Sequence, residues 1–244
     1  MKGQVPDTLV IEALFSSIAG AYDRVNWLLS LGRYGRWLDE AARQACDGAE
    51  LRLLDVGTGT GELALRLAGR AGPGSVVWGV DCSEPMISRA RQKAGRRVRF
   101  ARGYAESLPF PGGCFDCVCM SFVLRNLPRP QPALAEAARV TRAGGRLIVL
   151  ELGKHPPPLL DRFIRAHLRH WAPLLGGEPY RWLDLSRQLF PPAYIQDRWL
   201  AGAGWVVEHR ARLAWGLVEL VRASLPGQVG EHHAGRRQEW REQH

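Results

Sequence analysis

Lysine is scarce in this chain of 244 residues, because only Lys2, Lys93 and Lys154 stand among its 33 basic residues. A formal net charge of +9 would suit a nucleic acid or an anionic membrane surface. The excess of arginine over lysine, together with abundant alanine, glycine and proline, is equally typical of a skewed genome composition. The charge by itself therefore identifies no partner.

Long hydrophobic runs are also missing. No uninterrupted apolar stretch approaches the roughly 20 residues that a membrane-spanning helix requires, and the N-terminal sequence lacks the pattern of a signal peptide. The length and the 46% content of hydrophobic residues predict a single globular domain with a sizeable core. We expect a cytoplasmic protein.

The five cysteines do not form the framework of a secreted disulfide protein in a chain of this length. Cys114 and Cys117 have the spacing of half a zinc or redox motif, but no second pair accompanies them. Their apolar neighbours favour small buried thiols in a strand. The polar segment 225–244, with His232, His233 and His244, is predicted to be disordered rather than a metal site. We expect no metal.

The most informative stretch that is present runs from Leu53 to Leu63 (Leu-Leu-Asp-Val-Gly-Thr-Gly-Thr-Gly-Glu-Leu). A short apolar run is followed by three alternate glycines, and helical spacing resumes at Leu63. Glycines let the backbone approach a ligand where a Cβ atom would clash. The stretch therefore predicts a strand that delivers a binding loop to the start of a helix.

Three kinds of nucleotide site compete for this loop. A P-loop needs Gly-Lys-Ser/Thr at its end, whereas this chain has Gly61-Glu62-Leu63. A dinucleotide site needs a third glycine where Glu62 stands, and the carboxylate would repel a pyrophosphate, which disfavours a nicotinamide oxidoreductase. The pattern Asp-x-Gly-x-Gly-x-Gly resembles motif I of class I S-adenosylmethionine-dependent methyltransferases. Their cofactor carries a sulfonium and an ammonium, so nearby carboxylates are favourable.

Strands and helices alternate from residue 51 onward, which predicts a parallel sheet with helices on both faces. We expect strands at 53–56, 76–80, 98–100, 115–122, 146–152, 205–208 and 212–220, the last of which also fits a short helix. Helices are expected at 85–93, 131–142, 159–171, 183–190 and 193–201. The fold class is α/β, a Rossmann-like methyltransferase fold with a seven-stranded, mostly parallel sheet. We divide the chain into a helical cap (1–48), a methyltransferase domain (49–224) with inserted helices at about 156–190, and the tail.

Asp81 follows the second predicted strand, one helix after the glycine loop. The carboxyl ends of parallel strands share one edge of the sheet, so Asp81 is placed to accept hydrogen bonds from the ribose hydroxyls of an adenosine. A turn or capping role is the alternative for a lone acid. Thr60 is equally suited to a cofactor contact or to a turn.

Several longer segments resemble the ubiquinone/menaquinone biosynthesis C-methyltransferase family. The resemblance covers about residues 11–220 and is carried by 15–26 (Phe-Ser-Ser-Ile-Ala-Gly-Ala-Tyr-Asp-Arg-Val-Asn), 29–32 with Trp37, 105–111 (Ala-Glu-Ser-Leu-Pro-Phe-Pro), 121–126 (Ser-Phe-Val-Leu-Arg-Asn), Arg139-Val140, 144–147, Glu151, and the spaced set Tyr180, Leu183, Ser186, Phe190 and Pro191.

The resemblance implies methyl transfer from S-adenosylmethionine to a ring carbon of a polyprenylated quinol. It implies a set of cofactor contacts around the predicted strand ends: Asp55, Gly57, Thr58, Gly59, Thr60, Gly61, Asp81, Cys82, Met86, Tyr104, Ala105 and Ser121. Tyr104 stands where the family usually has Asn or Asp. Segments 152–156 and 216–221 also depart from the family pattern, on the substrate side, so a different acceptor stays open.

Arg125 and Asn126, at the end of the fourth predicted strand, are candidate catalytic residues. They are placed to bind and polarise the quinol oxygen as phenolate character develops. Arginine stays protonated and is a poor base, so we favour electrostatic stabilisation or the positioning of a water. A structural arginine paired with an acid is the alternative.

Tyr22, Asp23 and Asn26 fall within one helical turn, which suits a lid over the cofactor. Tyr22 and Asp23 complete the predicted catalytic set, with Asp23 either accepting a proton after transfer or capping a helix. His155 lies near a strand end but is flanked by proline, which favours exposure to solvent over a role as a base.

The partner implied by the resemblance is a small lipophilic quinol, which the protein would meet at the inner face of a membrane. Phe163, Ile164, Leu168 and Trp171 could form a basic amphipathic face with their neighbouring arginines, or an ordinary core-facing helix. Dispersed arginines and the absence of an Asn-Pro-Pro-Tyr motif disfavour a nucleic-acid methyltransferase. Another small aromatic acceptor, methylated at C, N or O, is the main alternative, and a non-catalytic quinone-binding protein is a further one. The sequence leaves a homodimer open.

Overall fold

The structure is a computed structural model that describes residues 7–47, 49–153, 157–159, 161–163, 166–167 and 178–227. Several predictions fall outside these ranges. They concern His155, most of the predicted helix at 159–171 including Ile164, Leu168 and Trp171, and the tail beyond residue 227.

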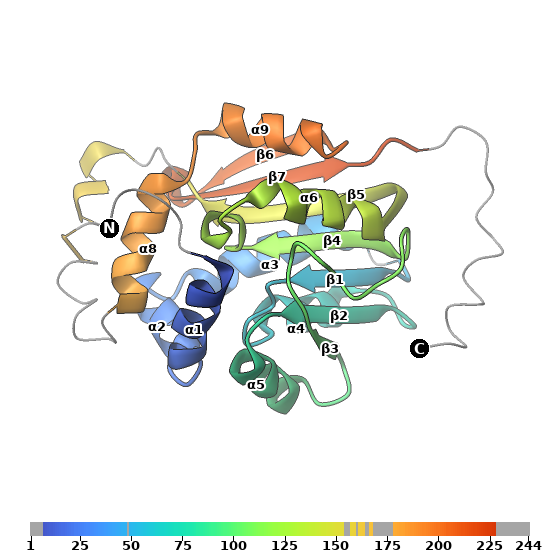
Figure 1. Cartoon of the computed structure of the whole chain (residues 1–244), viewed down its shortest axis with the longest axis horizontal. Coiled ribbons are helices and arrows are strands. Elements are labelled where there is room, and N and C mark those ends of the chain that lie inside the picture. The colour runs from blue at the N-terminus through green and yellow to red at the C-terminus, as the bar shows by residue number, and fades with distance from the viewer. Residues whose placement is uncertain are drawn as a thin grey trace.

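A seven-stranded sheet forms the centre of the molecule, in the order β3-β2-β1-β4-β5-β7-β6 (Figure 1). Only β7 runs antiparallel to its neighbours. The bounds are β1 Arg52–Val56, β2 Val76–Asp81, β3 Arg99–Arg102, β4 Phe115–Ser121, β5 Thr141–Leu152, β6 Val206–Leu213 and β7 Val218–Ser224. The predicted mostly parallel α/β sheet is confirmed.

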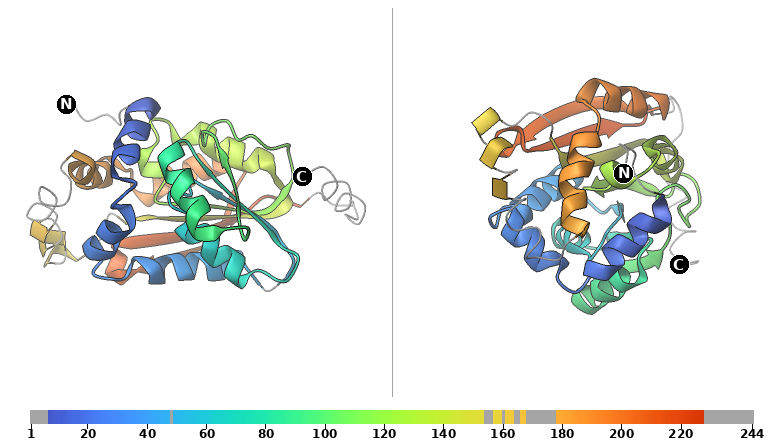
Figure 2. Two further views of the ribbon diagram at one scale, coloured as in Figure 1. Left: turned by 90° about the horizontal axis from the view of Figure 1, so that it is seen from below. Right: turned by 60° about the vertical axis from the view of Figure 1, so that its left-hand side comes forward.

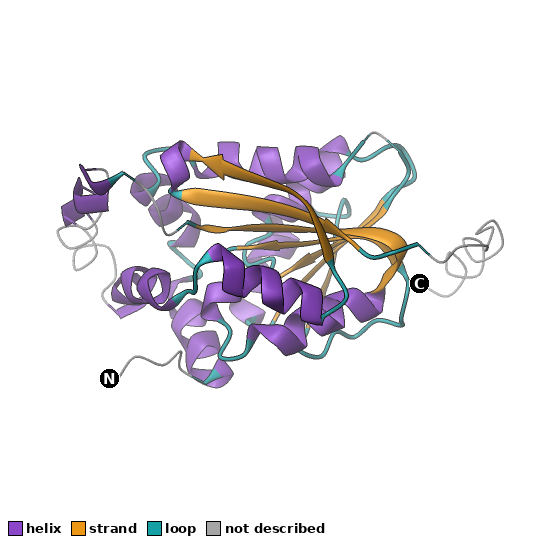
Figure 3. Ribbon diagram, turned by 90° about the horizontal axis from the view of Figure 1, so that it is seen from above, coloured by secondary structure: helices purple, strands orange, loops and turns teal. Residues whose placement is uncertain are grey.

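Helices cover both faces of this sheet (Figure 3). On one face α3 (Tyr34–Ala45) and α4 (Glu62–Arg70) pack against β1, β4 and β5 through Leu38, Ala41 and Leu67, all with no exposed surface. On the other face α6 (Pro130–Val140) and α9 (Ala193–Gly202) cover another cluster of buried apolar side chains, which includes Phe115 and Leu134. Burial of these side chains accounts for most of the favourable free energy of folding.

Three helices gather beyond the carboxyl ends of the strands (Figures 1 and 2). They are α1 (Thr8–Ile18), α2 (Tyr22–Leu29) and α8 (Glu178–Leu189). α5 (Glu84–Ala94) lies beside β2 and β3 and contacts α1. Of the segment predicted as a helical cap, α1 and α2 therefore lie over the strand ends, whereas α3 packs on the face of the sheet.

Two sets of predicted boundaries differ from the structure. β5 begins at Thr141, before the expected residue 146, because the backbone at Gly144 (φ 71°) and a register shift near Phe115 let pairing start earlier. The strand predicted over 212–220 is divided, since Ala214 and Trp215 have positive φ and turn the chain between β6 and β7. The alternative of a short helix there is confirmed only for the 3₁₀ turn η2 (Ala214–Gly216).

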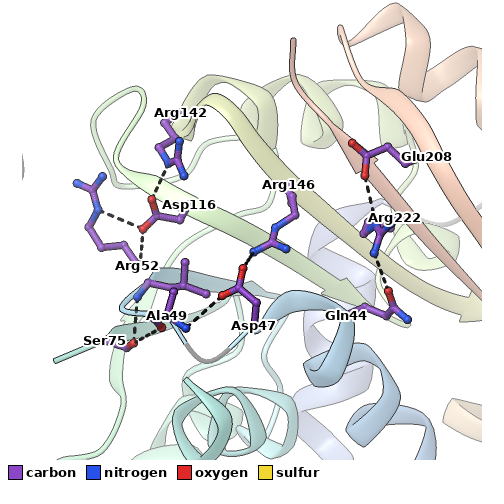
Figure 4. Close-up of polar contacts among 11 residues, drawn as sticks. Gln44, Asp47, Ala49, Arg52, Ser75, Asp116, Arg142, Arg146, Glu208 and Arg222 are labelled. Carbon is purple, nitrogen blue, oxygen red and sulfur yellow. Dashed lines mark hydrogen bonds and ion pairs between the residues drawn. The ribbon is translucent and has the colours of Figure 1, made fainter. Parts of the chain in front are cut away.

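Polar contacts join the amino ends of the parallel strands and the carboxyl end of the antiparallel β7 (Figure 4). Asp116 accepts hydrogen bonds from the backbone N–H of Arg52 at 2.7 Å and from Arg142 Nε at 2.6 Å. Arg146 pairs with Asp47, and Arg222 pairs with Glu208. Arg142, Arg146 and Arg222 are thus each paired with an acid of the protein. They lie at the end of the sheet opposite to the carboxyl ends of the parallel strands.

Candidate active site

The strand order reverses between β1 and β4, which is the point where open α/β sheets bind ligands. The glycine loop follows β1, and the segment Phe122–Asn126 follows β4. Gly57 (φ 67°) packs so closely on this segment that a Cβ atom would lie 2.4 Å from Cγ2 of Val123. Only glycine fits there, because both the backbone conformation and the space exclude a side chain.

Asp81 ends β2 and reaches across to the glycine loop. Its carboxylate accepts hydrogen bonds from the backbone N–H of Gly59 and of Ser83, each at 2.9 Å. Burial raises the pKa of Asp81, and these two hydrogen bonds oppose the shift. Each carboxylate oxygen keeps a further lone pair, so Asp81 can accept from a ligand while it holds the loop.

Asp55 lies beneath the same loop and has no exposed surface. The hydroxyl of Thr58 donates to its carboxylate at 2.7 Å. Burial raises the pKa of Asp55 to about 7. Asp55 and Thr58 therefore brace the loop from below.

A first cavity opens at this switch point and brings together most of the predicted cofactor residues. Its lining includes Tyr22, Gly57, Gly59, Asp81, Cys82, Met86, Tyr104, Ala105, Ser121 and Asn126. Asp55, Thr58, Thr60 and Gly61 do not line it and lie in or beneath the loop. The hydroxyl of Tyr104 donates to Glu12 of α1 at 3.0 Å, which ties the cap to this cavity.

A second, largely apolar cavity lies next to the first. Leu29, Leu31, Tyr34, Trp37, Leu152, Trp215 and Leu217 line it together with Asn26, Arg33, Arg125 and Arg187. Tyr22 and Phe122 line both cavities. A ligand in the first cavity and an apolar ligand in the second would therefore meet between these two rings.

Arg125 faces the second cavity and is paired with a buried acid. Its Nη1 lies 2.5 Å from Glu151 Oε1, and the two side chains are only 7% and 3% exposed. The guanidinium also lies over the ring of Phe122, 5.5 Å from its centroid, and its Nε has no hydrogen-bond partner. The pairing with an acid that we considered from the sequence is present, and Arg125 also lines the second cavity.

Asn126 lines the first cavity, and its amide is engaged at both ends. Its Nδ2 donates to the carbonyl of Phe122 and its Oδ1 accepts from Trp182 Nε1, each at 2.9 Å. These bonds hold the turn after β4 against α8. The hydrogen bond from Asn126 also holds the backbone of Phe122, which has a positive φ of 59°.

Asp23 does not line either cavity. Its carboxylate accepts from the hydroxyl of Thr60 and pairs with Lys93, which also pairs with Glu62 at 3.0 Å. No side-chain capping bond forms at the start of α2, where the N-cap residue is Ala21. Asp23 therefore fastens the cap to the glycine loop.

Asn26, Tyr34 and Phe122, which the sequence did not single out as catalytic, line the second cavity beside the predicted catalytic residue Tyr22. Asn26 lines it with its side-chain amide beside the hydroxyl of Tyr22. Burial raises the pKa of Tyr22, while its hydrogen bond with Asn26 opposes this. Phe122 stacks on Tyr34 with ring centroids 5.6 Å apart. The positive φ of Phe122 could not be predicted from the sequence, because only a glycine indicates that the backbone can take such a conformation.

The described residues contain no group of three or more His, Cys, Asp or Glu side chains that could hold a metal. All five cysteines are free, and Cys114, Cys117 and Cys119 are buried. Among the helices that the structure describes, none has the length and apolar character needed to cross a membrane.

The sheet order, the glycine loop and the acid after β2 define a Rossmann-like methyltransferase fold. The chain belongs to the ubiE/COQ5 methyltransferase family, whose model matches residues 3–223. The family resemblance noted from the sequence is thereby confirmed, and the protein is a methyltransferase.

The match with this chain covers most of the length of each of these relatives. A demethylmenaquinone methyltransferase of Thermus thermophilus is 41% identical over 80% of this chain and 93% of its own. A ubiquinone/menaquinone biosynthesis C-methyltransferase of Methylobacterium nodulans is 37% identical over 82% of this chain and 84% of its own. The magnesium protoporphyrin IX methyltransferase of Synechocystis, solved with S-adenosylhomocysteine, shares the fold with a TM-score of 0.65 at 19% identity, covering 90% of this chain and all of that one.

Proposed function

We propose that this protein transfers a methyl group from S-adenosylmethionine to a ring carbon of a polyprenylated quinol precursor of the demethylmenaquinol or ubiquinone-precursor type. The observation that carries the proposal is the pair of cavities that meet at Tyr22 and Phe122. One has the glycine loop and Asp81 of an adenosine site, and the other is apolar enough for a prenylated ring. The names of the relatives support this acceptor.

The first cavity fits the cofactor because its backbone approaches closely and its acid is correctly placed. Gly59 leaves no side chain between the loop and a ligand, Gly57 lets the loop pack on Val123, and the carboxylate of Asp81 has lone pairs for ribose hydroxyls. The cofactor supplies a methyl group that is already a good electrophile. The protein's task is then to hold the ring carbon in line with it, which can contribute up to roughly 7 to 11 kcal/mol.

Arg125 and Asn26 are proposed to orient the quinol ring. Asn26 lines the second cavity and its amide carries two N–H donors, so it can bind a ligand as well as the hydroxyl of Tyr22. A ring oxygen of the quinol is a suitable acceptor. Arg125, held by Glu151, would stabilise the phenolate that forms when the quinol hydroxyl loses its proton, before the ring carbon attacks the methyl group.

Asn126, Asp23 and Tyr22 are proposed to act through position. Asn126 fixes the turn after β4, and Asp23 keeps α2 closed on the glycine loop. Tyr22 lines both cavities and would separate water from the reacting atoms. The quinol hydroxyl would release its proton to water before transfer, and the methylated ring carbon would return its own proton to that oxygen as aromaticity is restored, so none of the three has to exchange a proton.

The acceptor's apolar tail implies that the reaction takes place at a membrane, at its inner face if the protein is cytoplasmic. Methylation of another small aromatic compound at C, N or O is the alternative acceptor chemistry, supported by the departures from the family pattern at 152–156 and 216–221.

The proposal is tested by calorimetry with S-adenosylmethionine and by transfer of a labelled methyl group to demethylmenaquinol and to unrelated phenols. We expect cofactor binding that Asp81→Ala abolishes and label incorporated into the quinol alone. No binding, or no effect of Asp81→Ala, would refute the cofactor site, and label in the phenols alone would refute the acceptor. Mass spectrometry of quinones from cells that lack the protein then identifies the accumulated demethyl species and the position methylated.

A further inference from the structure

Two tight turns surround the mouth of the second cavity and expose large apolar side chains. Trp27, in the last turn of α2, and Leu31, in the turn that follows it, are 64% and 63% exposed, and the turn between β6 and β7 carries Trp215, which is 67% exposed. Figure 2 shows the two turns side by side, the first in blue and the second in red. We name Trp27, Leu31, Arg33 and Trp215 the rim.

Contacts within the rim make it one continuous surface. The guanidinium of Arg33 lies over the ring of Trp215, 5.2 Å from its centroid. Leu31, Arg33 and Trp215 all line the second cavity. Trp27 packs along the turn, because a Cβ atom built on Gly32 would lie 3.3 Å from its Nε1. The rim therefore continues the apolar lining of the cavity to the outside of the protein.

The backbone of both turns is strained to hold these side chains outward. Leu31 (φ 51°) and Trp215 (φ 56°) have left-handed backbone conformations. These conformations are unfavourable for any residue that has a Cβ atom. Exposing large apolar side chains to water is unfavourable as well. Strain of this kind persists at sites that have a function, and here the strained residues surround the entrance for the acceptor.

The charge of this surface favours an anionic partner. Among the described residues, no aspartate or glutamate lines the second cavity. Inside it, Arg125 and Arg187 are neutralised by Glu151 and Asp161. Arg33 and the neighbouring exposed Arg36 take part in no ion pair with the residues that the structure describes.

We propose that the rim docks on the surface of an anionic phospholipid bilayer, so that the second cavity opens directly into the membrane. This inference rests on the proposed lipophilic acceptor. Tryptophan and arginine suit the boundary between headgroups and acyl chains, since each combines an apolar body with a polar or charged end. The prenylated tail can then remain in the bilayer while the ring enters the cavity between Leu31 and Trp215. Docking is thereby assigned to the rim and not to the predicted helix at 159–171, for which the sequence left a basic amphipathic face and a core-facing helix open.

The test measures sedimentation of the purified protein with vesicles of phosphatidylglycerol and phosphatidylcholine in equal parts, without cofactor or acceptor. We expect the protein to sediment with these vesicles and far less with phosphatidylcholine alone. Trp27→Ser should weaken the binding about tenfold, which corresponds to roughly 1.4 kcal/mol, and Trp27→Ser/Trp215→Ser about 100-fold. Arg33→Gln should reduce the preference for phosphatidylglycerol.

Val206→Ser is the matched control. Val206 is 54% exposed and pairs with Ser224 at the opposite edge of the sheet, so its substitution removes apolar surface away from the rim. Val206→Ser should bind vesicles as the unaltered protein does. Thermal melting of each variant should match the unaltered protein, since all these side chains are exposed.

Three results would overturn the proposal. The first is that the unaltered protein does not bind the mixed vesicles, and the second is that Val206→Ser loses as much binding as the rim variants. The third is that vesicle binding is absent and analytical ultracentrifugation shows a dimer, which the double variant Trp27→Ser/Trp215→Ser no longer forms. The last would make the rim an interface between two copies of this chain. Methyl transfer to a short-chain quinol in detergent reports separately on the proposed function. Trp27→Ser, outside the cavity, should keep that turnover and lose it only with vesicle-bound acceptor.

Discussion

Arg125 is paired with a buried acid and also faces the acceptor cavity, and one pair of variants separates these two roles. Arg125→Met leaves the carboxylate of Glu151 buried without its cation. Both side chains are less than one-tenth exposed, so the loss is that of a broken buried ion pair, about 3 to 5 kcal/mol. For a protein of this size that lowers Tm by about 6 to 20 °C.

Arg125→Met/Glu151→Gln removes the charge from both positions. The amide oxygen of a glutamine can still accept from the backbone N–H of Leu152, which Glu151 binds at 2.9 Å. The double variant should therefore lie within roughly 2 kcal/mol of the unaltered protein, because neither ion remains buried alone. Stability should recover in the double variant although two residues are changed instead of one.

Activity should not recover with stability. The guanidinium is absent from both variants, so each should lose about 100-fold or more in kcat with the quinol acceptor. Binding of S-adenosylmethionine should stay within a few-fold, since Arg125 does not line the first cavity. The measurements are thermal melting, cofactor calorimetry and initial rates. Full activity in the double variant would show that Arg125 serves only packing, and equal melting of the two variants would contradict the ion-pair argument.

Three further predictions concern the loop and its support. Gly57→Ala should abolish cofactor binding in calorimetry, because the new Cβ would lie 2.4 Å from Val123; normal affinity would show that the loop tolerates a side chain. Because burial raises the pKa of Asp55 from 3.8 to about 7, the folded protein keeps a proton that the unfolded chain releases between these pH values. Stability should thus fall as pH rises from about 4 to 7, and melting curves should show less of this dependence in Asp55→Asn; an unchanged slope would refute the assignment. Asp23→Ala frees the cap from Thr60 and should weaken cofactor binding about tenfold with little change in Tm; unchanged affinity would mean that the cap closes without this contact.

Much of the fold followed from local patterns in the sequence. β1, β2 and β4 are short apolar runs, and the glycine loop and Asp81 stand at strand ends that a parallel sheet must bring to one edge. This is why most of the predicted cofactor residues were found around one cavity. The boundary between β6 and β7 was wrong because non-glycine residues with positive φ leave no signal in a sequence. The start of β5 was wrong because its pairing before Gly144 depends on a register shift against β4.

The sequence by itself determined the class of fold, the family and the position of the glycine loop, since these depend on residue types at short spacing. Only the tertiary structure decided what each polar side chain contacts: Asp23 binds Thr60 and Lys93 instead of facing a cavity, and Arg125 pairs with Glu151. It also decided that turns some 180 residues apart form one exposed rim. Such contacts join residues distant in the chain, so no local pattern records them.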